Sequence, residues 1–201
     1  MSHDERRFEP ANRGALVAPE RWAHWDPPRF LAGLALGPGQ TVLDLGCGPG
    51  FWTLPLADIV GQAGRVWALD VSRTMLEELM GRRPPPQVWP LQAELPAIPL
   101  QDDSVDLVWS AFVFHEVEPP RRLAAEIRRV SRRIAVLEWR PDAAGHRGPP
   151  RAHRPSPQRV AGWLLEAGFA RAIQTWQDAD TYLLEGDRGE QQNVEPLNSL
   201  L

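Results

Sequence analysis

The stretch VLDLGCGPG at residues 42–50 decides the fold of this chain. Its apolar first half reads as a buried strand that contains one acid, Asp44, and glycines follow at Gly46, Gly48 and Gly50. The residues after the glycines carry apolar side chains with helical spacing. Glycines between a strand and a helix allow unusual backbone angles and bring a ligand close to main-chain atoms. The stretch therefore predicts a strand, a ligand-binding loop and a helix.

Outward from this loop, strands and helices alternate along the chain. Strands are predicted at residues 41–46, 65–70, 86–92, 104–114, 132–139, 170–177 and 181–187. Helices are predicted at residues 19–25, 27–36, 51–60, 72–82, 119–130 and 156–169. Because parallel neighbours need a crossover, this alternation predicts an α/β fold, a Rossmann-like and mostly parallel seven-stranded sheet with helices on both faces. The last two strands are expected to form an antiparallel C-terminal hairpin.

The length of 201 residues suits one domain, which we expect at residues 19–186, including the N-terminal helices. An irregular N-terminal segment, residues 1–18, is expected before it, and a mobile tail, residues 187–201, after it. A formal net charge of -4 argues against a generally basic surface that coats nucleic acid. The single cysteine excludes an internal disulfide framework, and no apolar run is long enough for a transmembrane segment. We therefore expect a cytoplasmic protein.

The three glycines and two acids narrow the classes of ligand that the loop could bind. Sheets of this kind bind ligands beyond the carboxyl ends of their strands. The loops that we expect to line the site are those after residues 46, 70, 91, 111 and 139. The dinucleotide pattern G-x-G-x-x-G fails, because Phe51 or Thr53 occupies the third glycine position. A carboxylate at Asp44 disfavours a pyrophosphate and suits an ammonium or sulfonium group, whereas Asp70, ending the second strand, is placed to accept hydrogen bonds from a ribose.

A nucleoside joined to a positively charged amino acid describes S-adenosylmethionine, and several motifs resemble the class I methyltransferase family that uses it. VLDLGCGPG resembles the glycine-rich first motif of the family, and VWALDVS its acidic second motif. AELPAIPLQDDSVDLVWS is similar to the adenine loop and fourth strand, and FVFHEVEPP to the segment after that strand. The similarity spans about residues 20–185 and is to the ubiquinone/menaquinone-biosynthesis-like branch. It implies S-adenosyl-L-methionine as the cofactor and methyl transfer as the reaction.

The resemblance also implies a set of cofactor-binding residues. They are Asp44, Gly46, Cys47, Gly48, Gly50, Asp70, Val71, Glu94, Leu95 and Ser110. The methionine moiety would lie against the main chain of Gly46, Cys47 and Gly48, with Asp44 near its amino group, and Asp70 would bind the ribose diol.

At the adenine end, the resemblance places Val71 on the ring, Glu94 at its amino group and the Leu95 backbone N–H facing the ring. The family usually has Asp after Gly where this chain has Glu94, so a displaced loop with a solvated acid is the alternative there. Ser110 would lie beneath the methyl donor, or is simply a serine at a strand end.

His115 and Glu116, just past the fourth strand, are the candidate catalytic residues. Either one would act as a general base for an oxygen or carbon acid. The alternatives are a histidine that orients the loop or caps the next helix, and an exposed acid before that helix.

A small-molecule acceptor, quinol-like, phenol-like or other, is what the resemblance favours, and the alternative is a non-catalytic S-adenosylmethionine-binding regulator or partner subunit. No metal site is expected, because the histidines lack ligand-like spacing. The arginines of RRLAAEIRRVSRR, residues 121–133, lie opposite an apolar stripe and indicate a solvated face rather than an RNA site. His146, Arg147, Arg151, His153 and Arg154, on a proline-rich connector, would either meet a polar acceptor or stay solvated.

Overall fold

The computed structural model describes residues 14, 16–144 and 147–189. Its strands are β1 (Thr41–Leu45), β2 (Arg65–Asp70), β3 (Val88–Gln92), β4 (Leu107–Ala111), β5 (Arg133–Trp139), β6 (Arg171–Gln177) and β7 (Thr181–Asp187). Its helices are α1 (Pro19–Trp25), α2 (Pro27–Leu31), α3 (Thr53–Val60), α4 (Arg73–Gly81), α5 (Pro120–Val130) and α6 (Pro157–Glu166), with a 3₁₀ turn, η3, at Arg151–His153. Most of the predicted N-terminal segment, residues 1–18, and of the predicted tail, residues 187–201, lies outside the described residues.

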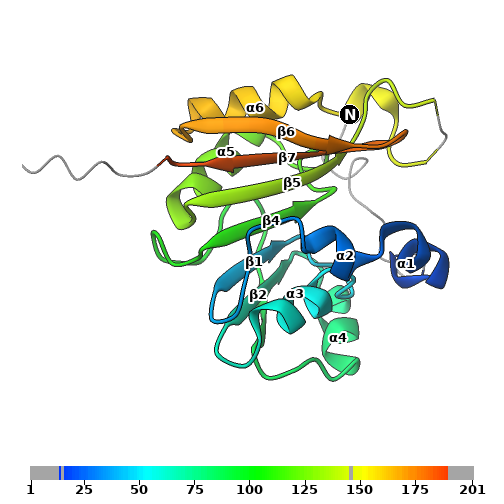
Figure 1. The fold of residues 1–201 in the computed structure, drawn as a ribbon, viewed down its shortest axis with the longest axis vertical. Coiled ribbons are helices and arrows are strands. Elements are labelled where there is room, and N and C mark those ends of the chain that lie inside the picture. Colours follow the sequence, from blue (N-terminus) through cyan, green and yellow to red (C-terminus); the bar gives the residue numbers. More distant parts are fainter. Residues whose placement is uncertain (1–13, 15, 145–146, 190–201) are drawn as a thin grey trace, which may run out of the picture.

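The strands form one sheet in the order β3-β2-β1-β4-β5-β7-β6. The five strands from β3 to β5 pair in parallel, and β7 runs antiparallel to both β5 and β6. Figure 1 shows α5 and α6 beside the upper strands and α3 and α4 beside the lower ones. The predicted Rossmann-like sheet of seven strands and its antiparallel hairpin are therefore confirmed, with the second strand of the hairpin inserted next to β5.

The core lies in two layers because side chains alternate across each strand. On β1, Leu43 and Leu45 face the apolar layer beneath α5 and α6, where Leu123 and Leu164 are buried. Val42 faces the opposite layer beneath α2 and α3. Both faces are covered, as the near-continuous apolar runs of these strands require.

Several predicted boundaries differ from the structure, and two of the larger differences lie in β4 and α2. The strand predicted at 104–114 ends at Ala111, because Phe112 adopts a left-handed backbone with φ 64° and turns the chain away from the sheet. The helix predicted at 27–36 ends at Leu31, two residues before Gly33, a residue with low helix propensity. The left-handed turn at Phe112 matters for the site, because it directs the residues after β4 over the end of the sheet.

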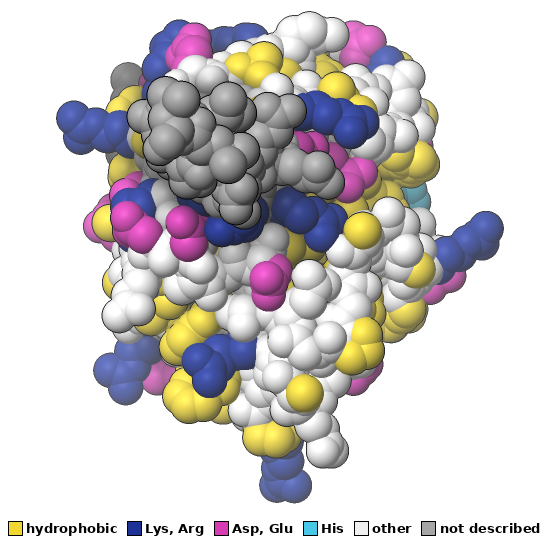
Figure 2. Space-filling model, turned by 60° about the vertical axis from the view of Figure 1, so that its left-hand side comes forward, with side chains coloured by type: hydrophobic (Ala, Val, Ile, Leu, Met, Phe, Trp, Pro, Cys, Tyr) yellow, Lys and Arg dark blue, Asp and Glu magenta, His cyan; other side chains and the backbone are white. Residues whose placement is uncertain are grey.

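Charges of both signs are mixed on one face of the molecule. On the face drawn in Figure 2, arginine and acidic side chains lie among one another outside the grey region. No helix in the described part of the chain combines the length and apolar character needed to cross a bilayer.

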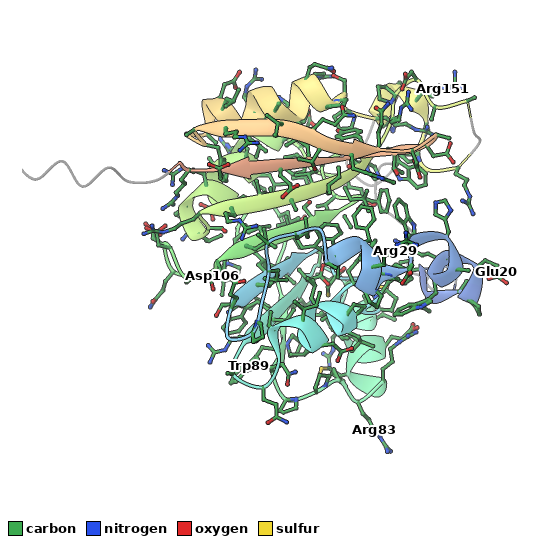
Figure 3. All side chains as sticks on the ribbon, viewed as in Figure 1. Glu20, Arg29, Arg83, Trp89, Asp106 and Arg151 are labelled. Carbon is green, nitrogen blue, oxygen red and sulfur yellow. The ribbon has the colours of Figure 1, made fainter. Side chains whose placement is uncertain are left out.

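The amino and carboxyl ends of the strands lie on opposite sides of the molecule. Asp106, which precedes β4, donates its backbone N–H to Thr41 at the start of β1, so both mark the amino ends. Figure 3 shows Glu20 of α1 and Arg151 of the connector after β5 on the side opposite Asp106. The N-terminal helix and the connector therefore lie at the carboxyl ends of the strands, where this fold binds ligands.

Candidate active site

A cavity of about 1090 Å³ opens at the carboxyl ends of the parallel strands. All five predicted loops contribute to its wall, through residues that include Cys47 after β1, Val71 after β2, Leu95 after β3, His115 after β4 and Gly148 after β5. The cavity is large enough for a ligand of drug size together with a second small molecule.

The glycine loop forms part of the cavity wall and is shaped by close packing. Gly46, at φ 68°, leaves no room for a Cβ atom, which would lie 2.6 Å from Cγ2 of Val113. Gly50, at φ 92°, would place a Cβ atom 2.5 Å from Cδ1 of Leu79. The packing of Val113 and Leu79 thus leaves room only for glycine at positions 46 and 50. Of the loop residues, Gly46, Cys47, Gly48 and Pro49 line the cavity, whereas the predicted cofactor-binding residue Gly50 does not.

Asp70, the last residue of β2, lines the cavity and ties two loops together. Its carboxylate accepts hydrogen bonds from the backbone N–H of Gly48 at 2.9 Å and of Ser72 at 2.8 Å. Burial raises the pKa of this carboxyl, and the backbone hydrogen bonds oppose the shift. Each carboxylate has about four acceptor sites, so two further hydroxyl donors can be accommodated.

Asp44 lies behind the loop and is not among the residues that line the cavity. Its side chain is 1% exposed and accepts a hydrogen bond of 2.6 Å from Oγ1 of Thr53 at the start of α3. Burial raises the pKa of Asp44 to about 7, the Thr53 hydrogen bond opposes this, and the charge of Asp70 adds to it. Asp44 thus accepts a hydrogen bond from α3, the helix after the glycine loop, and does not line the cavity.

The residues predicted at the adenine end and beneath the methyl donor divide into two groups. Val71 and Leu95 line the cavity, and both are apolar. Glu94 is exposed and is not part of the cavity wall. Ser110 faces the core layer beneath α5 and α6, where its Oγ has no hydrogen-bond partner among the described residues, and Ala111 lines the cavity in its place.

His115 lines the cavity and is held by an acid that the sequence analysis missed, Glu138 of β5. Nδ1 of His115 lies 2.9 Å and 3.0 Å from the two carboxylate oxygens of Glu138, which is 0% exposed. The backbone N–H of Trp139 donates to the same carboxylate at 2.8 Å. A single acid inside the apolar run RIAVLEW was the available signal, because a buried charge in a strand needs a partner.

The environment of His115 sets its protonation. Burial lowers the pKa of the imidazole, but the charge and hydrogen bond of Glu138 outweigh it, and Glu116 adds to the effect. The net result is a pKa above the usual value. With Nδ1 engaged by a carboxylate, Nε2 is the nitrogen left for a ligand, and it lies 3.7 Å from Oε1 of Glu116, the second predicted catalytic residue.

The connector after β5 lies over the cavity and is fixed by a buried arginine. Arg154, 7% exposed, donates hydrogen bonds to the backbone carbonyls of Pro149, Arg140 and Arg147. Of the five connector residues considered from sequence, Arg147 lines the cavity. The guanidinium of Arg154 binds the main chain, and His146 lies outside the described residues.

Aromatic residues from α1 and the neighbouring loops complete the wall. Trp25 lines the cavity and packs on Phe30, Trp52 and Phe112, with ring centroids 5.6, 6.0 and 5.8 Å away. Trp22 is 45% exposed and does not line it. Within the described chain no three His, Cys, Asp or Glu side chains lie close enough together to hold a metal ion.

The chemistry of the wall fits an adenosyl amino acid. Gly46 to Gly48 present main chain with little side-chain cover, and Asp70 has acceptor capacity for a sugar. Val71, Met75 and Leu95 form an apolar surface suited to a purine.

Comparison with known proteins supports the same reading. Residues 42–133 match a family model described as a methyltransferase domain. The chain is 34% identical over 100 residues to a demethylmenaquinone methyltransferase of Lysinibacillus sphaericus, covering 48% of this chain and 42% of that protein. It is 33% identical over 140 residues to a 2-phytyl-1,4-naphtoquinone methyltransferase of Trichormus variabilis, covering 65% and 56%. The chain thus spans about half the length of the curated relatives it matches.

A solved structure is similar over nearly its whole length. The crystal structure of a SAM-dependent methyltransferase from Aquifex aeolicus superposes with a TM-score of 0.82 at 30% identity, covering 90% of this chain and 98% of the other. The strand order, the glycine loop and this similarity agree with one another. The chain therefore belongs to the class I S-adenosylmethionine-dependent methyltransferase family.

Proposed function

We propose that this protein transfers a methyl group from S-adenosylmethionine to a small-molecule acceptor of the quinol or phenol type. The observation that carries the proposal is the pairing of His115 with Glu138 beside the cavity that the glycine loop lines. A cofactor loop alone would suit a protein that only binds the cofactor. A buried imidazole held by a carboxylate is an arrangement for moving a proton, which an acidic hydroxyl or carbon must lose when it is methylated.

In this proposal the cofactor supplies an electrophilic methyl group on a sulfonium. The main chain of Gly46 and Gly48 holds the methionine moiety, the carboxylate of Asp70 accepts from the ribose, and Val71 and Leu95 lie against the adenine. Because these groups come from three loops of one rigid sheet, they fix the orientation of the reacting centre.

His115 acts as the general base. Its Nδ1–H donates to Glu138, which leaves Nε2 unprotonated and able to take the proton of the acceptor. Glu138 then stabilises the imidazolium that results, as a positioning residue that does not itself touch the acceptor. Glu116, close to Nε2, makes the same region more favourable for a positive charge.

The cavity wall supports an aromatic acceptor. Trp25, Phe112, Val113, Val117 and Trp139 all line the cavity and give it an apolar character near His115. The named substrates of the two curated relatives, a demethylmenaquinone and a phytyl-naphthoquinone, belong to the same chemical class.

The described surface gives little support for a nucleic-acid acceptor. On α5, Arg129 pairs with Glu126 and Asp102, and Arg121 pairs with Glu166. Local acids thus already neutralise part of the arginine-rich helix, and charges are intermixed on the face in Figure 2.

The test is turnover with a panel of quinols, phenols and cell extract, measured as release of S-adenosylhomocysteine. We expect His115→Gln to lower kcat by about 10²–10⁴-fold, the usual contribution of a general base, without changing cofactor affinity. His24→Gln is the matched control, because His24 also lines the cavity but lies beside Asp178 at 3.9 Å. Binding of S-adenosylhomocysteine without turnover of any acceptor would favour the non-catalytic alternative.

A further inference from the structure

Arg21, on α1, brings a partly buried positive charge to the cavity. Its side chain lines the cavity, and its Nε is buried without a hydrogen-bond partner. It forms no ion pair with any residue that the structure describes, although several acids line the same cavity. Burial lowers the pKa of Arg21 to about 10, which leaves the guanidinium charged at neutral pH. A partly buried cation that has no counter-ion among the described residues is costly unless an anion joins it.

Two aromatic rings fix the position of this charge. The guanidinium carbon lies 4.6 Å from the ring centroid of Phe51 and 5.7 Å from that of Phe112. Phe51 directly follows the glycine loop, and Phe112 directly follows β4. Stacking on aromatic rings favours a defined orientation of a guanidinium and leaves its edge free for an anion. The charge is therefore held between the loops after β1 and β4.

The strand order relates this charge to the groups that we assign to the adenosine. Asp70 and Val71 follow β2, and Leu95 follows β3, so the adenosine end lies over one half of the cavity. In the order β3-β2-β1-β4, the loops beside Arg21 lie on the other half. Three strand spacings amount to about 14 Å, comparable with an extended adenosyl amino acid. The amino-acid end of the ligand thus reaches the region of Arg21.

We propose that Arg21 binds the α-carboxylate of the methionine moiety, an inference that rests on the proposed function. A guanidinium pairs with a carboxylate through two parallel hydrogen bonds, which suits Arg21, whose Nε has no hydrogen-bond partner among the described residues. The other cationic groups of the wall are less suited. His115 is engaged by Glu138, His24 lies 3.9 Å from Asp178, and Arg147 is exposed.

The test compares two ligands by calorimetry. S-adenosylhomocysteine carries the carboxylate, whereas 5′-methylthioadenosine keeps the adenosine and thioether but lacks the amino acid. We expect Arg21→Met to weaken S-adenosylhomocysteine binding roughly 10–100-fold, the usual range for a hydrogen-bonded charge, and to leave 5′-methylthioadenosine binding unchanged. Arg21→Lys should lose less than Arg21→Met. Arg29→Met on α2, exposed and outside the cavity wall, is the matched control and should change neither affinity.

Each other result overturns the inference in a recognisable way. Unchanged S-adenosylhomocysteine affinity in Arg21→Met refutes it, and a raised acceptor KM in that variant would assign the charge to the acceptor instead. An equal loss for both ligands would mean that Arg21 only supports the shape of the cavity. If the wild-type protein bound neither ligand, the proposed function would fail together with the inference.

Discussion

The carboxylate of Glu138 lies 2.9 Å and 3.0 Å from Nδ1 of His115, and neither residue is more than 8% exposed. The acid comes from β5 and the histidine from the loop after β4, so the pairing depends on two neighbouring strands of the sheet. In so buried a place the charge of Glu138 determines which nitrogen of His115 carries the proton and how strongly it is held.

Replacing Glu138 by Gln should therefore lower kcat and shift its pH dependence. The general base must be unprotonated, so activity falls as the pH drops through the pKa of His115. Because Glu138 raises that pKa, E138Q should move the acidic limb of the pH–rate profile to lower pH. We expect a loss of up to about 10⁴-fold in kcat at the optimum, as when the acid that orients a catalytic histidine is replaced by its amide. If the acidic limb of E138Q fell at the same pH as that of the wild type, the role of Glu138 would be contradicted. E185Q on β7 serves as the control.

Asp44 should make the stability of the protein depend on pH. In the folded protein it keeps its proton up to about pH 7, whereas its ordinary value is 3.8. A raised carboxyl pKa contributes stability that is complete below the unfolded value and is lost as the pH rises through the folded one. At about 1.4 kcal/mol per pKa unit, the wild type should lose about 4 kcal/mol relative to Asp44→Asn over this window. Urea unfolding at several pH values measures the difference, and parallel curves for the two proteins would contradict it.

The sequence predicted the sheet and the cavity wall because both follow from local patterns. Apolar runs alternating with amphipathic segments specify parallel strands and crossovers, and the loops at the strand ends then have to meet. The outcome for individual residues was less uniform. Asp70, Val71 and His115 line the cavity as expected from their strand ends, whereas Asp44 and Ser110 lie behind it, because a side chain at a strand end can face either layer.

The residues that the sequence did not predict depend on contacts between distant segments. Glu138 is 23 residues from His115 along the chain, and no local pattern links an acid in one strand to a histidine after another. Arg21 lies in a short helix, α1, and it is partly buried and packs on Phe51 and Phe112, which belong to distant segments. In the sequence, such a residue shows only as a single charge among apolar neighbours, and nothing there indicates its partner.

Gly148, in the connector, should tolerate no side chain. At φ 80°, a Cβ atom there would lie 2.6, 2.7 and 3.0 Å from atoms of the Trp139 ring, which also lines the cavity. Gly148→Ala must therefore displace the connector or the ring, and we expect a several-fold higher acceptor KM. Gly39→Ala is the matched control, because Gly39 has φ 85° and nothing within 4 Å of its Cβ position. Both variants should lose about 1–2 kcal/mol of unfolding free energy, because alanine is strained in a left-handed backbone. Equal acceptor KM values in the two variants would contradict the steric argument.

Arg154 should stabilise the connector and oppose Glu138 electrostatically. Its guanidinium donates to the carbonyls of Pro149, Arg140 and Arg147, so Arg154→Met leaves three acceptors in partly buried hydrogen bonds without their donor. Removing the buried charge offsets part of that cost, and a net loss of about 2 kcal/mol is expected, which lowers Tm by about 6 °C in a domain of this size.

The same variant tests the electrostatics of the site. The charge of Arg154 lowers the pKa of His115, so its removal should move the acidic limb of the pH–rate profile to higher pH, opposite to the shift expected for E138Q. A purely structural role for Arg154 would lower Tm and leave the limb in place. Arg151→Met, in the exposed part of the connector, is the control that should change neither Tm nor the profile. Shifts of opposite sign in the two variants would show that the acidic limb reports one histidine, whose pKa Glu138 raises and Arg154 lowers.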